Sequence, residues 1–107
     1  MSEYLELTPQ LHVRKWPGGI SRYIFWCVGC GEPHTIPVRE GPDQPEVKCW
    51  QFDGNLEKPT FTPSVHLPIP HSRRCHFNLL AGQIHYDKND CHHELAGKAV
   101  DMVAIPD

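Results

Sequence analysis

The fold of this chain is decided by residues 75–87, which read CHFNLLAGQIHYD. Two stretches rich in apolar and aromatic side chains flank Ala81-Gly82, a two-residue turn whose glycine can adopt positive φ. The pattern predicts a β-hairpin in which one face is apolar, because side chains alternate between the two faces of a strand. The apolar face carries Phe77, Leu79, Ile84 and Tyr86 with Cys75 at its end, and the polar face carries His76, Asn78, Leu80, Gln83, His85 and Asp87.

The rest of the chain has the composition of a small β protein. Its 107 residues are enough for one domain, and 11 prolines with 8 glycines favour turns and short strands over long helices. We expect further strands at residues 21–27, 34–38, 48–52 and 98–105, a loop at 39–46, and an irregular, proline-punctuated stretch at 59–70. One helical turn is expected to begin at Cys91 after an Asp90 cap and to end at Gly97. We therefore predict a mainly β fold, a small single domain over residues 1–107 with short antiparallel strands and at most one short helix.

Several functional classes are disfavoured by charge and hydropathy. The net charge is −3 and the basic residues are scattered, which does not favour nucleic-acid binding. No apolar run approaches the roughly 18 residues of a membrane span, and the N-terminal residues lack the pattern of a signal peptide. We expect a cytoplasmic protein, in which cysteines stay reduced and serve as metal ligands more often than as disulfides.

The strongest chemical motif is Cys27-Val28-Gly29-Cys30-Gly31, in a chain with 5 cysteines and 8 histidines. Two cysteines separated by two residues place both sulfur atoms on one side of a tight turn, and the glycines let backbone amides approach them. This is the knuckle half of a structural zinc site, in which thiolates bind zinc tetrahedrally. A redox pair would require a helix after the first cysteine, and Gly31 argues against one.

A knuckle needs two further ligands. Cys75 lies at the end of the apolar hairpin face, and Cys91 lies just after a turn, so these two are the first candidates, followed by His93. In an extended segment Cys91 and His93 share a face and both can bind, whereas on a helix only one can. Cys49 is expected to be a small core residue.

A second group of residues suggests a different chemistry. His34, His76 and His93 each follow a cysteine closely, and with Asp90 they would form a second, open metal site or supply a general base. The hydroxyls of Thr60, Thr62 and Ser64 alternate with prolines, and the favoured interpretation is that they satisfy backbone groups rather than line a pocket.

Six motifs in order resemble a family of small proteins found in phages, prophages and bacteria. The motifs are Phe25-x-Cys27-x-x-Cys30-Gly31-x-x-His34, Trp50-x-Phe52-x-Gly54, Pro59-Thr60-Phe61-x-Pro63-Ser64, Cys75-His76-Phe77, Gly82-x-Ile84 and Asp90-Cys91-x-His93-x-Leu95-Ala96-Gly97. Related sequences accompany bacterial ubiquitin-like operons, where the family is named BubE. The resemblance implies that Cys27, Cys30, His34, Cys75, His76, Cys91 and His93 belong to a shared pattern, and it implies no activity.

The leading interpretation is a small phage or bacterial zinc-binding protein in which zinc is structural, held by Cys27, Cys30 and Cys75 with Cys91 or His93. One alternative is a metal-dependent hydrolase that uses His34, His76 and His93. Another is an interaction module, whose partner would be a host or phage protein. A closed site with three or four thiolates would favour the structural role, and an open site with three histidines would favour the enzyme.

Overall fold

The N-terminal part of the chain forms a four-stranded antiparallel sheet in the order β1-β2-β3-β4. The computed structural model describes residues 2–69, 73–89, 91 and 93–106. The strands of this first sheet are β1 (Glu3–Thr8), β2 (Leu11–Lys15), β3 (Ile20–Cys27) and β4 (Glu32–Arg39). Strands β3 and β4 pair along their full length, which places His34 opposite Phe25 and Glu32 opposite Cys27.

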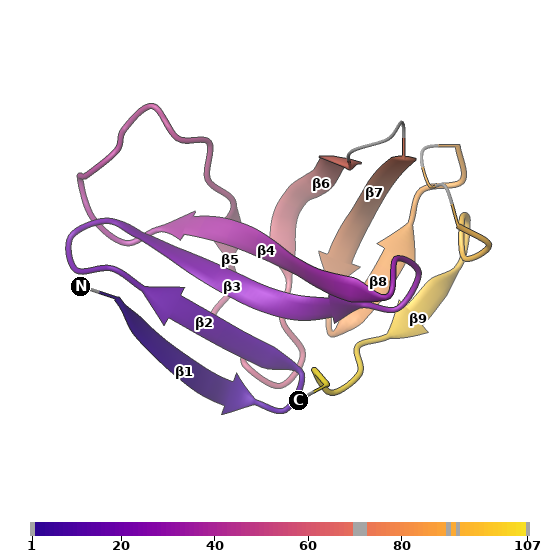
Figure 1. Ribbon diagram of the computed structural model, residues 1–107, viewed down its shortest axis with the longest axis horizontal. Helices are drawn as coiled ribbons and strands as arrows, with labels where there is room; N and C mark the ends of the chain where they lie inside the picture. The colour runs from indigo at the N-terminus through magenta and orange to yellow at the C-terminus, as the bar shows by residue number, and fades with distance from the viewer. Residues whose placement is uncertain (1, 70–72, 90, 92, 107) are drawn as a thin grey trace.

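The C-terminal part forms a five-stranded antiparallel sheet in the order β5-β6-β7-β8-β9. Its strands are β5 (Gln51–Phe52), β6 (Phe61–Ile69), β7 (Arg73–Leu80), β8 (Gln83–Tyr86) and β9 (Ala99–Asp101). An isolated bridge between Val38 and Trp50 joins the two sheets, and the N–H of Ile105 donates to the carbonyl of Pro9 near the end of β1 (Figure 1).

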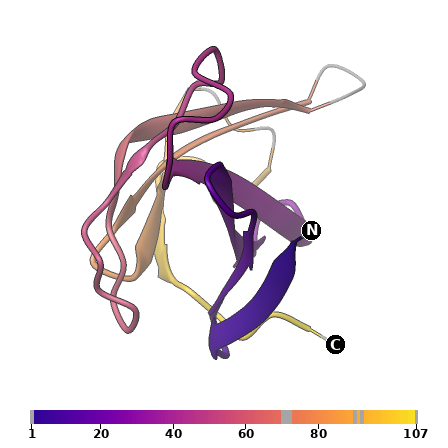
Figure 2. The ribbon, with the colours of Figure 1, turned by 90° about the vertical axis from the view of Figure 1, so that its left-hand side faces the viewer.

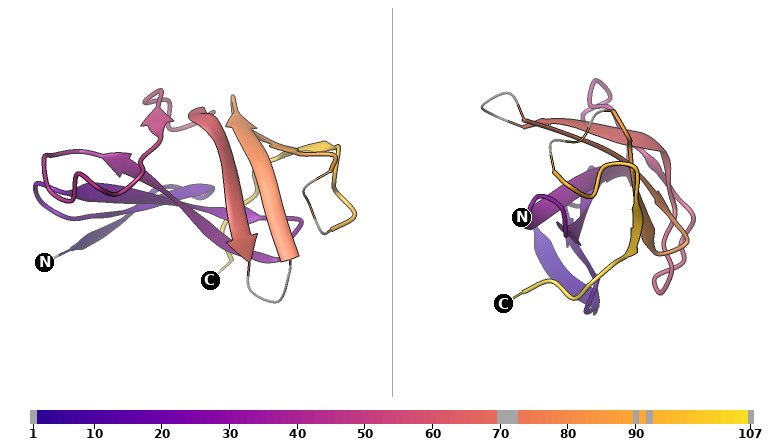
Figure 3. Two further views of the ribbon diagram at one scale, coloured as in Figure 1. Left: turned by 90° about the horizontal axis from the view of Figure 1, so that it is seen from above. Right: turned by 90° about the vertical axis from the view of Figure 1, so that its right-hand side faces the viewer.

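The two sheets face each other, and their strands cross at a steep angle (Figures 2 and 3). The core lies between them and contains Phe25 and Ile36 from the first sheet and Phe61, Phe77 and Leu79 from the second, all at most 1% exposed. The ring of His34 stacks on Phe77 across this interface, with ring centroids 6.0 Å apart. Packing in the core therefore brings the end of β3 and the beginning of β4 close to the middle of β7.

The structure confirms the mainly β prediction and the hairpin. Leu80 pairs with Gln83, Leu79 with Ile84, and Phe77 with Tyr86. The apolar face of the hairpin is buried in the core as expected. Within the described residues no helix is present, and residues 94–97 form a turn instead. The expected cap at Asp90 lies outside the described residues, and none of those described forms a helix able to cross a membrane.

One expectation about the strands was wrong, and one hairpin was not predicted. The stretch 59–70 was expected to be irregular, but residues 61–69 form β6, the longest strand. Strand β5 pairs with Phe61 and Thr62, and no other described strand pairs with this edge of β6. Proline is tolerated on such an open edge because its missing N–H breaks no hydrogen bond between strands. The β1–β2 hairpin was not predicted. Its turn is held by the Thr8 hydroxyl, which accepts the N–H groups of Gln10 and Leu11.

The ends of two expected strands also differ from the structure. Residues 48–52 contribute only the two-residue strand β5, and residues 98–105 contribute only β9. The short β5 matters for the site, because among the described residues it leaves most of β6 without a second strand partner.

Candidate active site and metal centre

The knuckle forms a tight turn directly after β3. The N–H of Gly31, at a φ of 68°, donates to the carbonyl of Cys27 at 2.8 Å. The N–H of Cys30 points at the sulfur of Cys27 at 3.4 Å. This amide-to-sulfur contact stabilises a thiolate at Cys27, and the turn brings the second sulfur to the same side.

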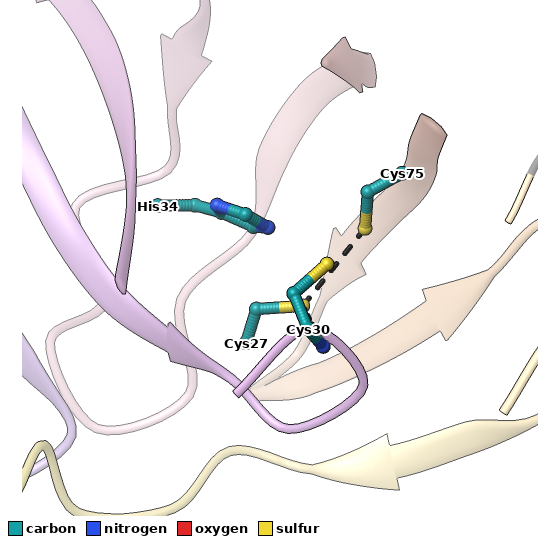
Figure 4. Close-up of side chains that lie close together, drawn as sticks. All are labelled: Cys27, Cys30, His34 and Cys75. Atoms are coloured by element: carbon teal, nitrogen blue, oxygen red, sulfur yellow. Dashed lines mark hydrogen bonds between the residues drawn. The ribbon is translucent and has the colours of Figure 1, made fainter. Parts of the chain in front are cut away.

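Two further donors complete the group that we call the metal centre: Cys27, Cys30, His34 and Cys75. Cys75 comes from β7 of the opposite sheet, and one donor atom from each of the four residues lies within 4.8 Å of the others. The sulfurs of Cys27 and Cys75 are 3.9 Å apart (Figure 4). Tetrahedral zinc with Zn–S bonds of about 2.3 Å would hold two sulfurs about 3.8 Å apart, whereas a disulfide needs about 2.05 Å.

His34 supplies the clearest sign that this group fits a metal. Its side chain is buried between Phe25 and Phe77, and its imidazole points toward the sulfurs (Figure 4). The Nε2 atom is buried and has no hydrogen-bond partner among the described residues. A buried imidazole nitrogen normally has a partner, and coordination to a metal would provide one.

The pKa values of the three thiols are shifted because their sulfurs lie close to one another. The hydrogen bond with Cys75, assisted by the Tyr86 hydroxyl, lowers the pKa of Cys27 to about 3. Burial and the nearby negative charge of Cys27 raise the pKa of Cys30 to about 12, and the pKa of Cys75 is raised as well. Ionisation is therefore favoured at Cys27 and opposed at Cys30 and Cys75, and the positive charge of a bound cation would offset the repulsion among the sulfurs.

A second group, Cys75, Cys91 and His93, shares the Cys75 sulfur with the metal centre. The Cys91 thiol donates to the carbonyl of His76 at 3.1 Å. The Nε2 atom of His93 is 3.8 Å from the Cys75 sulfur, and its Nδ1 accepts the N–H of Leu95 at 3.3 Å. Because Nδ1 accepts a hydrogen bond, the neutral ring carries its proton on Nε2 and donates it toward Cys75.

The five predicted metal ligands thus gather around Cys75, but in two groups. Cys27, Cys30 and Cys75 lie together with His34, which belongs to the pattern shared with the family but was not among the three preferred partners of the knuckle. Cys91 and His93 form the second group with the same Cys75. Cys49 belongs to neither group, and its thiol donates to the carbonyl of Val47 in a loop.

The described residues do not bring His34, His76 and His93 into one cluster. Along β7 the side chains alternate, so Cys75 points into the core while His76 points out of the sheet. The three-histidine metal site expected as an alternative is therefore not formed by these residues, and Asp90 lies outside the described part of the chain.

The outward face of the second sheet carries a different arrangement, which sequence reasoning missed. The hydroxyl of Ser64 lies 2.9 Å from Nε2 of His76. On the other side of the ring, Nδ1 faces a carboxylate oxygen of Asp87 at 3.9 Å. The other oxygen of Asp87 accepts the N–H of Asn89 at 2.8 Å, which fixes the carboxylate. We call Ser64, His76 and Asp87 the outer triad.

Three adjacent strands position the outer triad. Asp87 directly follows β8, and its N–H donates to the carbonyl of His76 at 2.8 Å, so these two residues lie side by side. Between Phe61 and Val65 the register of β6 against β7 shifts in a bulge that contains Ser64. Bulges change the direction of a side chain, and they are frequent beside active sites.

A serine hydroxyl bonded to an imidazole, with a carboxylate on the far side of that imidazole, is the arrangement that activates serine as a nucleophile. The hairpin register predicted His76 and Asp87 on one polar face. The motif around Ser64 was interpreted as a source of backbone hydrogen bonds, and no sequence signal located the bulge that aims its hydroxyl at His76.

Comparison with known proteins gives one match. No curated protein and no solved structure matches the chain significantly. A family model matches residues 2–87, which contain the knuckle, Cys75 and the whole outer triad. Since this match covers most of the chain, the protein belongs to the family described as bacterial ubiquitination-like system serine protease (BubE).

Proposed function

We propose that this protein is a serine peptidase of a bacterial ubiquitin-like modification system, with Ser64 as nucleophile, His76 as general base and Asp87 as the group that orients the base. The observation that carries the proposal is the 2.9 Å contact between the Ser64 hydroxyl and His76 Nε2, with the Asp87 carboxylate facing Nδ1. The description of the family as a serine protease supports it.

The geometry supports acyl transfer in two steps. In the first, the Ser64 oxygen attacks the substrate carbonyl while its proton moves to Nε2 of His76, and the imidazolium then protonates the departing amine. An ester between the substrate acyl group and Ser64 remains. In the second step His76 takes a proton from water, whose oxygen attacks the ester carbonyl. The bond to Ser64 then breaks, the imidazolium returns the proton to the Ser64 oxygen, and the acid is released. Asp87 stabilises the imidazolium in both steps.

The experiment is covalent labelling of the full chain with a fluorophosphonate, read by intact-mass and peptide mass spectrometry. One phosphonyl adduct on Ser64 is expected. Ser64→Ala and His76→Ala should abolish it, while Thr62→Ala, which removes an exposed hydroxyl from the same strand, should not. An unlabelled wild-type protein, or an adduct that survives Ser64→Ala, would contradict the proposal.

We further propose that the metal centre binds zinc as a structural ion, held by the thiolates of Cys27, Cys30 and Cys75 and by His34. None of the five cysteines forms a disulfide, as expected in the reducing cytoplasm of a bacterium or of a phage-infected host. Zinc bound there would supply positive charge to three closely spaced sulfurs and connect the two sheets. It would take no part in the chemistry, because Cys75 points inward and His76 outward.

Elemental analysis and zinc-edge X-ray absorption test this second proposal. One zinc per chain with three sulfur and one nitrogen ligands is expected. His34→Ala should lower the zinc content, whereas His93→Gln should retain it, because an amide can still donate to Cys75. Four sulfur ligands would instead assign Cys91 as the fourth, and loss of zinc in the His93 variant alone would assign His93.

A further inference from the structure

Strand β6 has an open edge beside the outer triad. On the side away from β7 its only strand partner in the described part of the chain is β5, which pairs with Phe61 and Thr62. From residue 63 to residue 69, no described strand pairs with that side of β6. Ser64 lies at the start of this open stretch, where β5 ends.

The main-chain groups of His66 face this open edge. His66 pairs with His76 across the β6–β7 ladder, and the carbonyl of His76 accepts the N–H of Asp87 on β8. The main chain of His76 therefore faces β8, and His66 and His76 form a pair without mutual hydrogen bonds. In such a pair the side chains approach closely, and the two imidazole rings are stacked with centroids 5.1 Å apart.

Two neighbouring residues support this orientation. The carbonyl of Ser64, two residues before His66, accepts the indole N–H of Trp50 at 3.2 Å on the β5 side. Two residues after His66 comes Pro68, which has no N–H, and a proline is tolerated where the main chain faces an open edge. The open edge therefore offers the N–H and carbonyl of His66 and the carbonyl of Pro68.

Resting on the proposed serine chemistry, we infer that the substrate is an extended, unfolded segment of polypeptide that adds to the sheet as a strand along β6, paired with His66. Adjacent strands lie about 4.8 Å apart, so a segment on this edge would pass within reach of the Ser64 hydroxyl. The carbonyl of Ser64 already accepts the indole N–H of Trp50, so the added strand cannot pair with β6 beyond His66 in that direction. The scissile bond would therefore lie at this end of the added strand, beside Ser64. Folded domains would be cleaved only in loose tails or linkers.

The experiment compares one phosphonate warhead with and without an attached mixed-sequence tetrapeptide, on the full chain. The ratio of the two labelling rates at Ser64 measures the contribution of the peptide. His66→Ala removes the imidazole and keeps the N–H, whereas His66→Pro removes both. The tetrapeptide should accelerate labelling of the wild type and of His66→Ala, and the acceleration in His66→Pro should be about three- to tenfold smaller, the usual effect of one lost hydrogen bond.

A second measurement needs no variant. N-methylation of each tetrapeptide amide in turn, on the wild-type protein, should slow labelling at alternate positions only, because every second amide of an added strand faces the sheet. Equal acceleration in both His66 variants, or tolerance of methylation at every position, would overturn this inference while leaving the serine chemistry intact. Failure of the bare warhead to label Ser64 would overturn the proposed function itself.

Discussion

Zinc at the metal centre would connect the two sheets, and the size of the stabilisation that it would give can be worked out from the chain. Cys27 and Cys75 are separated by 48 residues. A cross-link that closes a loop of this length removes conformational entropy from the unfolded chain worth about 4 kcal/mol. In a domain of this size that corresponds to a fall in Tm on the order of 15 °C when the metal is removed. This is a large fraction of the roughly 5–15 kcal/mol that stabilises a domain.

Cys75→Ser tests this estimate through a double comparison. Urea unfolding would be followed by tryptophan fluorescence, with and without a zinc chelator. The chelator should destabilise the wild type by about 4 kcal/mol. It should destabilise Cys75→Ser much less, because the link to the second sheet is already broken. Each protein is compared with itself, with and without the chelator. The free-energy cost of burying a serine hydroxyl at position 75 is the same in both measurements and therefore cancels.

The matched control is Cys49→Ser, which removes a thiol outside both cysteine groups and should respond to the chelator as the wild type does. The reasoning would be refuted if the chelator left the wild type unaffected. It would equally be refuted if Cys75→Ser lost as much stability as the wild type on chelation.

Three further changes have definite expected outcomes. Asp87→Asn should slow phosphonate labelling of the serine about 100-fold without changing the urea midpoint, since the imidazole loses its orienting charge. Gly29→Ala should cost about 1–3 kcal/mol in urea unfolding, because a Cβ would lie 2.3 Å from the ring of His93; a normal midpoint would contradict this packing. The pKa of Tyr23 is raised above its ordinary 10 by burial and by Glu40, so its neutral form adds stability that is lost as pH rises above about 10. Tyr23→Phe should flatten the decline of stability between pH 9 and 11, and a slope identical to wild type would disprove the assignment.

Local patterns were sufficient to predict the hairpin and the knuckle. The register of β7 and β8 follows from alternation around Ala81-Gly82, and the turn geometry follows from the Cys27–Cys30 spacing. Those patterns also indicated that Cys75 points inward and that His76 and Asp87 share the polar face.

The remaining features depend on contacts between the sheets and on one irregularity in pairing. His34 reaches the sulfurs only because β4 packs over Phe77 of the opposite sheet. Ser64 reaches His76 only because a bulge shifts the register of β6. Neither a crossing of sheets nor the position of a bulge has a periodic signal, so the approach of His34 to the sulfurs and that of Ser64 to His76 could be found only from the structure.

The two sites depend on the same strand register. Cys75 and His76 are neighbours on β7, one directed into the metal centre and the other into the outer triad. A one-residue slip of β7 would exchange the two faces, turning the imidazole into the core and the thiol out of it. The outer triad takes its residues from β6, β7 and the position directly after β8. The three side chains therefore meet only when these strands pair in the observed register. A metal bound at Cys75 would penalise every slipped pairing by the loss of a ligand. The inner site would therefore contribute to catalysis by selecting the one register in which Ser64, His76 and Asp87 meet.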